Sequence, residues 1–317
     1  MTFKNSIEFA LELDKKDPLA SYQDKFYFPL QNNGDKYIYL CGNSLGLQSK
    51  NTEEFVQQEL EDWKSLGVEG HLHAKNPWLP YHEFLSSSYS KIVGAKENEV
   101  VAMNTLSVNL HLMMVSFYRP TKARHKIVIE SDAFPSDIYA VESHIKHHGL
   151  DPSSSLIKLA PRKGEVVVRT EDILNIINEN SDSISLILLG GVNYYTGQVF
   201  DMQKITDFAH KYNIMVGFDL AHAAGNIDLS LNDWGVDFAV WCSYKYLNSG
   251  PGSVAGVFIH EKHHKRKLER FAGWWGHDKQ SRFKMPDEFI PIETAEGWQL
   301  SNPPILSLAA VRASLSI

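Results

Sequence analysis

Cysteine is scarce in this 317-residue sequence, which contains only Cys41 and Cys242. Two cysteines cannot build the disulfide framework of a small secreted protein, so a reducing compartment is expected. No apolar run reaches the ~18 residues of a membrane-spanning helix, and residues 1–18 are an amphipathic mixture without the apolar core of a signal peptide. These absences predict a cytoplasmic protein without a membrane partner.

Positive charge is also in short supply, because 31 lysines and arginines face 38 acidic residues and leave a net charge of −7. Such a chain has no field that attracts nucleic acid, so no nucleic-acid partner is expected. An anionic ligand must instead be held by local hydrogen-bond donors. The sequence has no internal repeat and no low-complexity segment, and its length suits about two domains.

Apolar runs of strand length alternate with helical patterns from residue 100 onward. This alternation predicts an α/β protein with a mainly parallel sheet that is covered by helices on both faces. The predicted strands are 37–40, 99–104, 126–131, 183–192, 214–219, 237–243 and 252–260. The predicted helices are 5–16, 50–66, 106–117, 135–149 and 202–213.

Residues 240–252, VWCSYKYLNSGPG, place Lys245 directly after a buried strand and before a glycine-rich turn. The carboxyl ends of strands are where open α/β sheets bind ligands, although a lone lysine at such a place more often extends to solvent. Asp219 ends another buried strand and needs a cationic or N–H partner, because burying an unpaired carboxylate is costly. Thr105 and Ser107 begin a helix after a third strand, either as an anion site or as a simple N-cap.

Phe134 and Asp137 follow a fourth strand end and complete a set that matches pyridoxal phosphate. The aldehyde of this cofactor needs a lysine, and its pyridine nitrogen needs a carboxylate to stay protonated. Its phosphate needs N–H and hydroxyl donors, and its ring needs an aromatic face. Each element is weak alone, but their order along the chain is specific.

Nine short motifs make this hypothesis narrower. They are GNSLG (42–46), NTLSVNLHL (104–112), FPSD (134–137), YYTGQ (194–198), DLAHAAGN (219–226), SYKYLNSGPG (243–252), GWWGH (273–277), RFKM (282–285) and SNPPI (301–305). With them the sequence resembles the kynureninase family, fold-type-I pyridoxal-phosphate enzymes of the class V aminotransferase superfamily. The resemblance covers nearly the whole chain.

The resemblance implies a fold-type-I transferase fold with a mainly parallel, seven-stranded sheet between helices. It implies hydrolysis of L-kynurenine, or of 3-hydroxy-L-kynurenine, to L-alanine and anthranilate or 3-hydroxyanthranilate, within tryptophan catabolism or NAD biosynthesis. It also implies a homodimer with shared active sites. Rival interpretations are a cysteine desulfurase-like enzyme and a catalytically inactive fragment of the fold. Cys242 inside a strand and Cys41 before a tight turn speak against the exposed thiolate that a desulfurase needs.

The resemblance also assigns site residues. Lys245 forms the Schiff base with the cofactor, Asp219 pairs with the pyridine nitrogen, and Tyr244 relays a proton. The further cofactor-binding residues are Leu106, Ser107, Phe134, Pro135, Ser136, Asp137, His222, Asn302 and, from the neighbouring subunit, Trp274. The substrate-binding residues are Ser44, His71 and Asn302. Relatives often have serine where this chain has Gly190, which removes one polar contact near the cofactor.

Three regions are expected, namely an N-terminal arm (1–45), a large cofactor-binding domain (46–295) and the start of a C-terminal small domain (296–317). The remainder of the small domain, with the arginine for the substrate carboxylate, is expected to be absent from this sequence, which would leave apolar surface exposed on the helix of Leu306, Leu308 and Val311. No metal site is expected, because His71 and His73 lack a carboxylate or cysteine partner.

The basic run 261–270 and two histidine pairs are expected at the surface. The pairs are His147–His148 and His263–His264.

Overall fold

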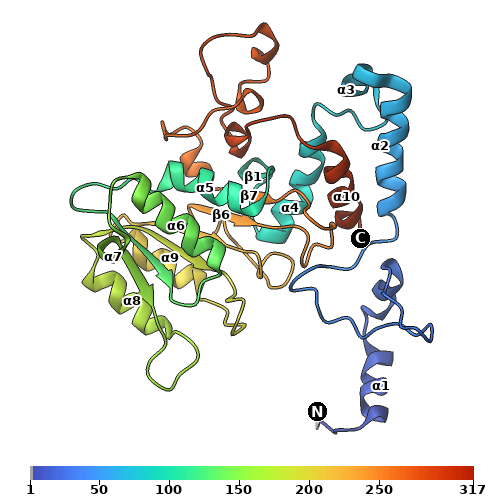
Figure 1. Ribbon diagram of the computed structural model, residues 1–317, viewed down its shortest axis with the longest axis horizontal. Coiled ribbons are helices and arrows are strands. Elements are labelled where there is room, and N and C mark those ends of the chain that lie inside the picture. Colours follow the sequence, from blue (N-terminus) through green and yellow to red (C-terminus); the bar gives the residue numbers. More distant parts are fainter. Residues whose placement is uncertain (1–2) are drawn as a thin grey trace.

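The computed structural model describes residues 3–317 and contains a seven-stranded sheet (Figure 1). The strand order is β1-β7-β6-β5-β4-β2-β3, with β7 antiparallel to both of its neighbours and the other pairs parallel. The strands are β1 (Val100–Ala102), β2 (Lys126–Glu130), β3 (Leu156–Leu159), β4 (Ile184–Gly190), β5 (Met215–Asp219), β6 (Phe238–Trp241) and β7 (Gly256–Ile259). The predicted fold class is confirmed.

Alternate residues of the strands enter two separate hydrophobic cores, one on each face of the sheet. In β4, Ile187 and Leu189 belong to the core that contains α4, α8, α9 and α10, whereas Leu186 and Leu188 belong to the core beneath α5 and α6. The helices are α1 (Ile7–Lys16), α2 (Thr52–Leu66), α3 (Gly70–His73), α4 (Ser86–Val93), α5 (Leu106–Phe117), α6 (Pro135–His147), α7 (Pro152–Ser155), α8 (Thr170–Glu179), α9 (Met202–His210) and α10 (Ile305–Leu315).

The N-terminal segment lies apart from the sheet (Figure 1). α1 forms as predicted but buries none of its residues. The strand predicted at 37–40 is wrong, since no strand forms there and Ile38 and Leu40 are 88% and 84% exposed. An apolar run needs a neighbouring strand to become part of a sheet, and among the described residues the bridges nearest to 37–40 are two isolated ones, Leu30–Lys36 and Phe26–Ser49.

α10 packs against α2 and the adjacent core. The expectation of exposed apolar surface on this helix is wrong for Leu308 and Val311, which are fully buried, whereas Leu306 is 39% exposed. The proposed division of the chain at residues 45 and 295 stays a prediction. Within residues 3–317, no helix has the length and apolar character that crossing a membrane requires.

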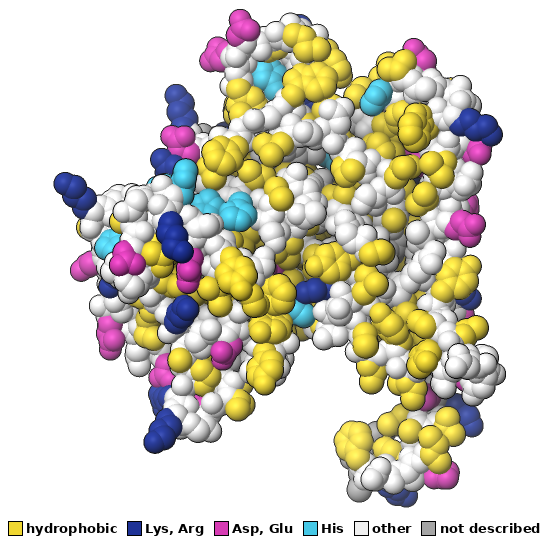
Figure 2. Space-filling view, viewed as in Figure 1, with side chains coloured by type: hydrophobic (Ala, Val, Ile, Leu, Met, Phe, Trp, Pro, Cys, Tyr) yellow, Lys and Arg dark blue, Asp and Glu magenta, His cyan; other side chains and the backbone are white. Residues whose placement is uncertain are grey.

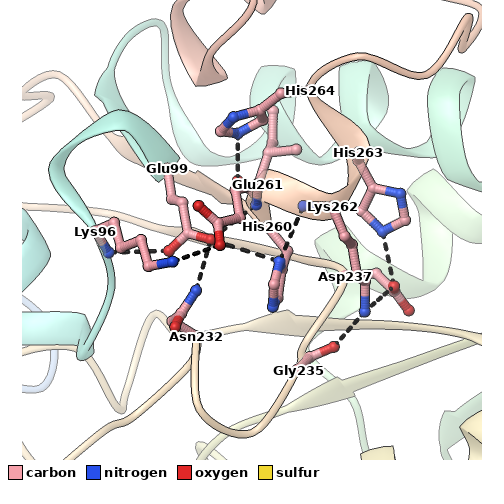
Figure 3. Close-up of polar contacts among 11 residues, drawn as sticks. Lys96, Glu99, Asn232, Gly235, Asp237, His260, Glu261, Lys262, His263 and His264 are labelled. Carbon is pink, nitrogen blue, oxygen red and sulfur yellow. Dashed lines mark hydrogen bonds and ion pairs between the residues drawn. The ribbon is translucent and has the colours of Figure 1, made fainter.

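The surface expectation for His263 and His264 is also wrong, because both side chains are buried. Figure 3 shows the polar contacts of these residues, with His263 directed toward Asp237. His263 Nε2 lies 2.8 Å from Asp237 Oδ1, and His210 Nε2 lies 3.0 Å from Asp237 Oδ2. Burial would raise the pKa of Asp237, but the hydrogen bonds with His210 and His263 outweigh it and lower the pKa well below its usual range. The network thus pins the segment after β7 to the start of β6. His147 and His148 are exposed as expected.

Candidate active site

A cavity opens where the carboxyl ends of the strands meet. The following residues line it: Leu106, Ser107, Glu130, Phe134, Ser136, Asp137, Gly190, Val192, Tyr194, Asp219, Ala221, His222, Tyr244 and Lys245. They come from the ends of β2, β4 and β5, from the loop after β6 and from the starts of α5 and α6. Parallel strands place their carboxyl ends at one edge, so residues far apart in the sequence converge there.

Lys245 is held between a histidine and an aromatic ring. Its Nζ lies 2.9 Å from His222 Nε2 and 5.9 Å from the centre of the Phe134 ring. Burial, and then the charge of Lys245, lower the pKa of His222 to about 4. His222 is therefore neutral near pH 7, and its Nε2 accepts a hydrogen bond from the lysine amine. The structure thus brings together the predicted lysine, histidine and phenylalanine.

Two aspartates, Asp137 and Asp219, face each other in the cavity at 7% and 8% exposure. Asp219 Oδ1 accepts from the Ala221 N–H at 2.7 Å, which supplies the partner expected for a buried carboxylate. Asp137 Oδ1 is buried without a hydrogen-bond partner. Burial, and then the charge of Asp219, raise the pKa of Asp137. Burial likewise raises the pKa of Asp219. The pair therefore favours a ligand that brings a proton or a positive charge.

The anion site predicted at the start of α5 has donors from two helices. Ser107 Oγ of α5 lies 2.9 Å from Ser136 Oγ of α6, so both helix N-termini reach the same corner of the cavity. Thr105 occupies the N-cap position of α5, but its side chain makes no capping hydrogen bond. Helix N-termini carry free N–H groups and partial positive charge, and hydroxyl groups complete the donor set for a phosphate.

Aromatic side chains form one wall of the cavity. Phe134 is half exposed and meets the Tyr194 ring edge to face at 5.4 Å. Tyr244 stays protonated near neutral pH, because burial, and then Cys242, raise its pKa to about 12. Its phenol can therefore donate a proton or a hydrogen bond.

The residues present fit pyridoxal phosphate. An amine, a buried carboxylate, an anion site and an aromatic face lie around one cavity, and the unpartnered Asp137 Oδ1 has room for a donor from a ligand. The same residues argue against a thiolate mechanism. Cys242 is 2% exposed, and burial is the main reason that its pKa is raised to about 11. Cys41 is exposed and precedes a turn, but it does not line this cavity.

Comparisons with known proteins agree with this geometry. A family model described as aminotransferase class-V matches residues 38–275. Kynureninase from Myxococcus xanthus is 58% identical over 99% of this chain and 74% of its own length. Kynureninase from Koribacter versatilis is 56% identical over 99% of this chain and 74% of its own length. Kynureninase from Nematostella vectensis is 51% identical over 98% of this chain and 70% of its own length. The chain belongs to the kynureninase family.

Solved structures with the same fold are much more distant in sequence. A cysteine desulfurase from Thermococcus onnurineus matches with a TM-score of 0.71 at 17% identity, covering 100% of this chain and 71% of its own. A C-DES variant with glycine linked to its PLP cofactor matches with a TM-score of 0.73 at 14% identity, covering 93% and 71%. They confirm the fold-type-I architecture. With the family match, they imply pyridoxal phosphate as the cofactor of this kynureninase-family chain.

Five residues assigned by the kynureninase resemblance do not line the cavity. Ser44 lies on an exposed turn, but this turn touches the Lys245 loop, because the Gly46 N–H donates to the Tyr244 carbonyl at 2.8 Å. The other four are Pro135 at the exposed start of α6, His71 on α3, Trp274 at 40% exposure and Asn302, which is exposed. Their roles stay predictions, as do those of the residues that line the cavity.

Four residues that line the cavity were not predicted as site residues from the sequence. They are Glu130, Val192, Tyr194 and Ala221. Glu130 carried a usable signal, because it ends an apolar strand in the same way as Asp219 does. Tyr194 belongs to a motif that the sequence analysis quoted without assigning it a role. Val192 and Ala221 are apolar, and only the placement of their backbones brings them to the cavity.

Proposed function

We propose that this site binds pyridoxal phosphate at Lys245 and hydrolyses L-kynurenine, or its 3-hydroxy form, to L-alanine and anthranilate or 3-hydroxyanthranilate. The observation that carries the proposal is the contact of Lys245 Nζ with a neutral His222, in a cavity that also contains Asp219. Kynureninase activity is the function of the family, and tryptophan catabolism is the pathway that it implies. The site residues and the substrate preference are the proposed part.

When bound, the cofactor supplies an electron sink conjugated to the amino group of the substrate. Asp219 holds the proton on the pyridine nitrogen that this sink requires. The Lys245 amine takes the proton from the α-carbon of the substrate, and His222 Nε2 orients that amine from 2.9 Å away.

The later steps need water and a proton donor. Water adds to the γ-carbonyl carbon of the substrate, the Cβ–Cγ bond breaks, and the oxygen of the water leaves in the aryl acid. The β-carbon takes up a proton, for which Tyr244 is the proposed relay because its phenol is protonated near neutral pH, and the Lys245 amine returns a proton to the α-carbon to complete L-alanine. The donors at the starts of α5 and α6 hold the phosphate, with Ser107 and Ser136 as hydroxyl ligands.

We also propose a homodimer in which Trp274 completes the site of the neighbouring subunit. Trp274 lies outside its own cavity, is 40% exposed and packs edge to face on Phe283. Exposed apolar side chains gather on the N-terminal segment, at the lower right of Figure 2, and include Phe3, Ile7 and Leu11. Ser44, His71 and Asn302 are the proposed substrate contacts, and the cytoplasm is the proposed location.

Lys245→Ala tests the central assignment. The protein is reconstituted with pyridoxal phosphate, and both its visible absorbance and the release of the fluorescent aryl acid are recorded. The variant should lose the absorbance band of the protein-bound imine and all turnover, whereas Lys163→Ala, at an exposed position, should keep both. Turnover or an imine band in Lys245→Ala would contradict the proposal.

A further inference from the structure

Glu130 is a buried carboxylate in the cavity to which the proposed mechanism gives no role. It is the last residue of β2, is 5% exposed, and lines the same cavity as Asp219 and Lys245. Its two carboxylate oxygens lie 3.1 and 3.3 Å from the backbone nitrogen of Gly190 at the end of β4. Glu130 therefore joins the ends of two neighbouring strands at the cavity.

The contact with Gly190 extends to Asp219. Gly190 faces Asp219 in the register of β4 and β5, and the Gly191 N–H donates to the Asp219 carbonyl at 2.9 Å. A chain of contacts thus runs from Glu130 through the successive N–H groups of Gly190 and Gly191 to the backbone carbonyl of Asp219.

The missing side chain at Gly190 makes room for this arrangement. A Cβ atom built on Gly190 would lie 3.0 Å from Glu130 Oε1, which is closer than ordinary van der Waals contact. Any side chain at this position therefore pushes against the carboxylate. Glycine at position 190 was expected to remove one polar contact near the cofactor. The carboxyl group of Glu130, from β2, now approaches the space that a side chain at this position would fill.

Charge gives Glu130 a second connection to the site. Burial raises its pKa to about 7, the N–H groups of Glu130 and Gly190 oppose the rise, and the charges of Asp219 and Asp132 add to it. The other titratable groups that line the cavity with it are Asp137 on α6, Tyr194 after β4, Asp219 on β5, His222 after β5, and Tyr244 and Lys245 after β6. Glu130 is therefore held closer to its neutral form than an exposed glutamate, and a positive charge nearby favours its carboxylate.

We propose that Glu130 is a positioning residue for Asp219: it holds the backbone of Gly190, whose neighbour Gly191 is hydrogen-bonded to the Asp219 carbonyl, and its carboxylate adds negative charge to the cavity. This role presupposes the proposed binding of pyridoxal phosphate at Lys245. Glu130 acts on the reacting atoms through the Gly190–Gly191 backbone and Asp219.

Cofactor affinity and the pH titration of the cofactor absorbance separate these two contributions. Glu130→Ala removes both the anchor and the charge, whereas the amide oxygen of Glu130→Gln can still accept from the Gly190 N–H. We expect Glu130→Ala to bind pyridoxal phosphate at least ~10-fold more weakly than the wild type. Glu130→Gln should stay within about threefold in affinity but shift the midpoint of the absorbance titration down, on the order of one pH unit, because a nearby negative charge favours protonated cofactor groups.

Glu142→Gln, on the outer side of α6, is the matched control and should leave both measurements unchanged. Thermal denaturation of each cofactor-free protein verifies that it folds. Gly190→Ala is a second route to the same test. It should weaken cofactor binding in the wild type but have a smaller effect in Glu130→Ala, because the space is then free.

Wild-type affinity in Glu130→Ala, together with an unchanged titration in Glu130→Gln, would overturn the role of Glu130 alone. Additive effects of Glu130→Ala and Gly190→Ala would overturn the anchoring contact. A wild-type protein that binds no pyridoxal phosphate would overturn the proposed function and this role with it.

Discussion

Asp219→Asn should make the enzyme much slower and the cofactor-free protein more stable. The substitution keeps the size of the side chain, and the amide oxygen can still accept from the Ala221 N–H, which lies 2.7 Å from Oδ1. What is lost is the negative charge beside a protonated pyridine nitrogen. At a hydrogen-bonding distance of ~3 Å and an effective dielectric constant of about 20, that charge pair is worth roughly 5 kcal/mol.

Part of this energy is lost to rearrangement of neighbouring groups, so we expect a rise in the activation free energy on the order of 4 kcal/mol, or about a 10³-fold loss in kcat. The assay is steady-state release of the aryl acid at saturating pyridoxal phosphate, beside a direct titration of cofactor affinity, which should change less. Asp228→Asn, on an exposed loop, is the control. A kcat within tenfold of the wild type would refute the role given to Asp219.

The opposite effect on stability follows from the pKa shifts. Burial raises the folded-state pKa of both Asp219 and Asp137. When the pH rises above the pKa values that these groups have in the unfolded chain, they therefore destabilise the folded, cofactor-free protein. Removing one carboxyl group from the pair relieves this cost. At pH 8 the cofactor-free variant should melt higher than the wild type by ~1–3 °C, a gain of roughly 1 kcal/mol. A lower melting temperature would show that the pair is not under electrostatic strain.

Three further predictions concern other contacts. His222→Gln should lower kcat ~10- to 100-fold, because the Lys245 amine loses the contact that orients it. The control His73→Gln, at an exposed position, should keep the wild-type kcat, and equal activities of the two variants would contradict the role of His222. Asp237→Asn should cost about 3 kcal/mol of unfolding free energy near pH 7. Since the folded pKa of Asp237 is depressed, the difference from wild type should shrink as pH falls below ~4, and a pH-independent difference would contradict this. Mixed Trp274→Ala and Lys245→Ala subunits should recover roughly a quarter of wild-type activity, because half of randomly formed dimers are mixed and have one intact site; no recovery would contradict sites completed by the partner.

The strand ends were predictable because they depend on local pattern and on a general rule of topology. Apolar runs end at Asp219 and just before Lys245, and parallel strands place such ends at one edge. The local pattern and this rule together are enough to place Asp219 and Lys245 at the same edge of the sheet. The same rule applied to Glu130 would have found a third carboxyl group, but its strand was used only to locate Phe134 and Asp137.

Other features depend on partners that the local sequence does not reveal. β3 lies at the edge of the sheet and includes the exposed Lys158, so its residues lack the long apolar run that marks an inner strand. His263 reads as part of a solvated basic run, yet Asp237, 26 positions earlier, draws it into the interior. The run at 37–40 has strand-like composition but meets no neighbouring strand in the described chain. In each case a tertiary contact decides against the local pattern.

Three buried carboxyl groups line the cavity that contains Lys245, and their burial determines which ligand the cavity can accept. Glu130, Asp137 and Asp219 each pay a desolvation cost that raises the pKa, and each is therefore poorly satisfied without a positively charged or proton-bearing ligand. His222 is driven the other way, to a neutral imidazole, by burial and by Lys245. A neutral acceptor beside the amine leaves the carboxylates as the groups that stabilise positive charge. A protonated pyridine ring meets that requirement, whereas a neutral ring or an anionic ligand placed at the carboxylates does not.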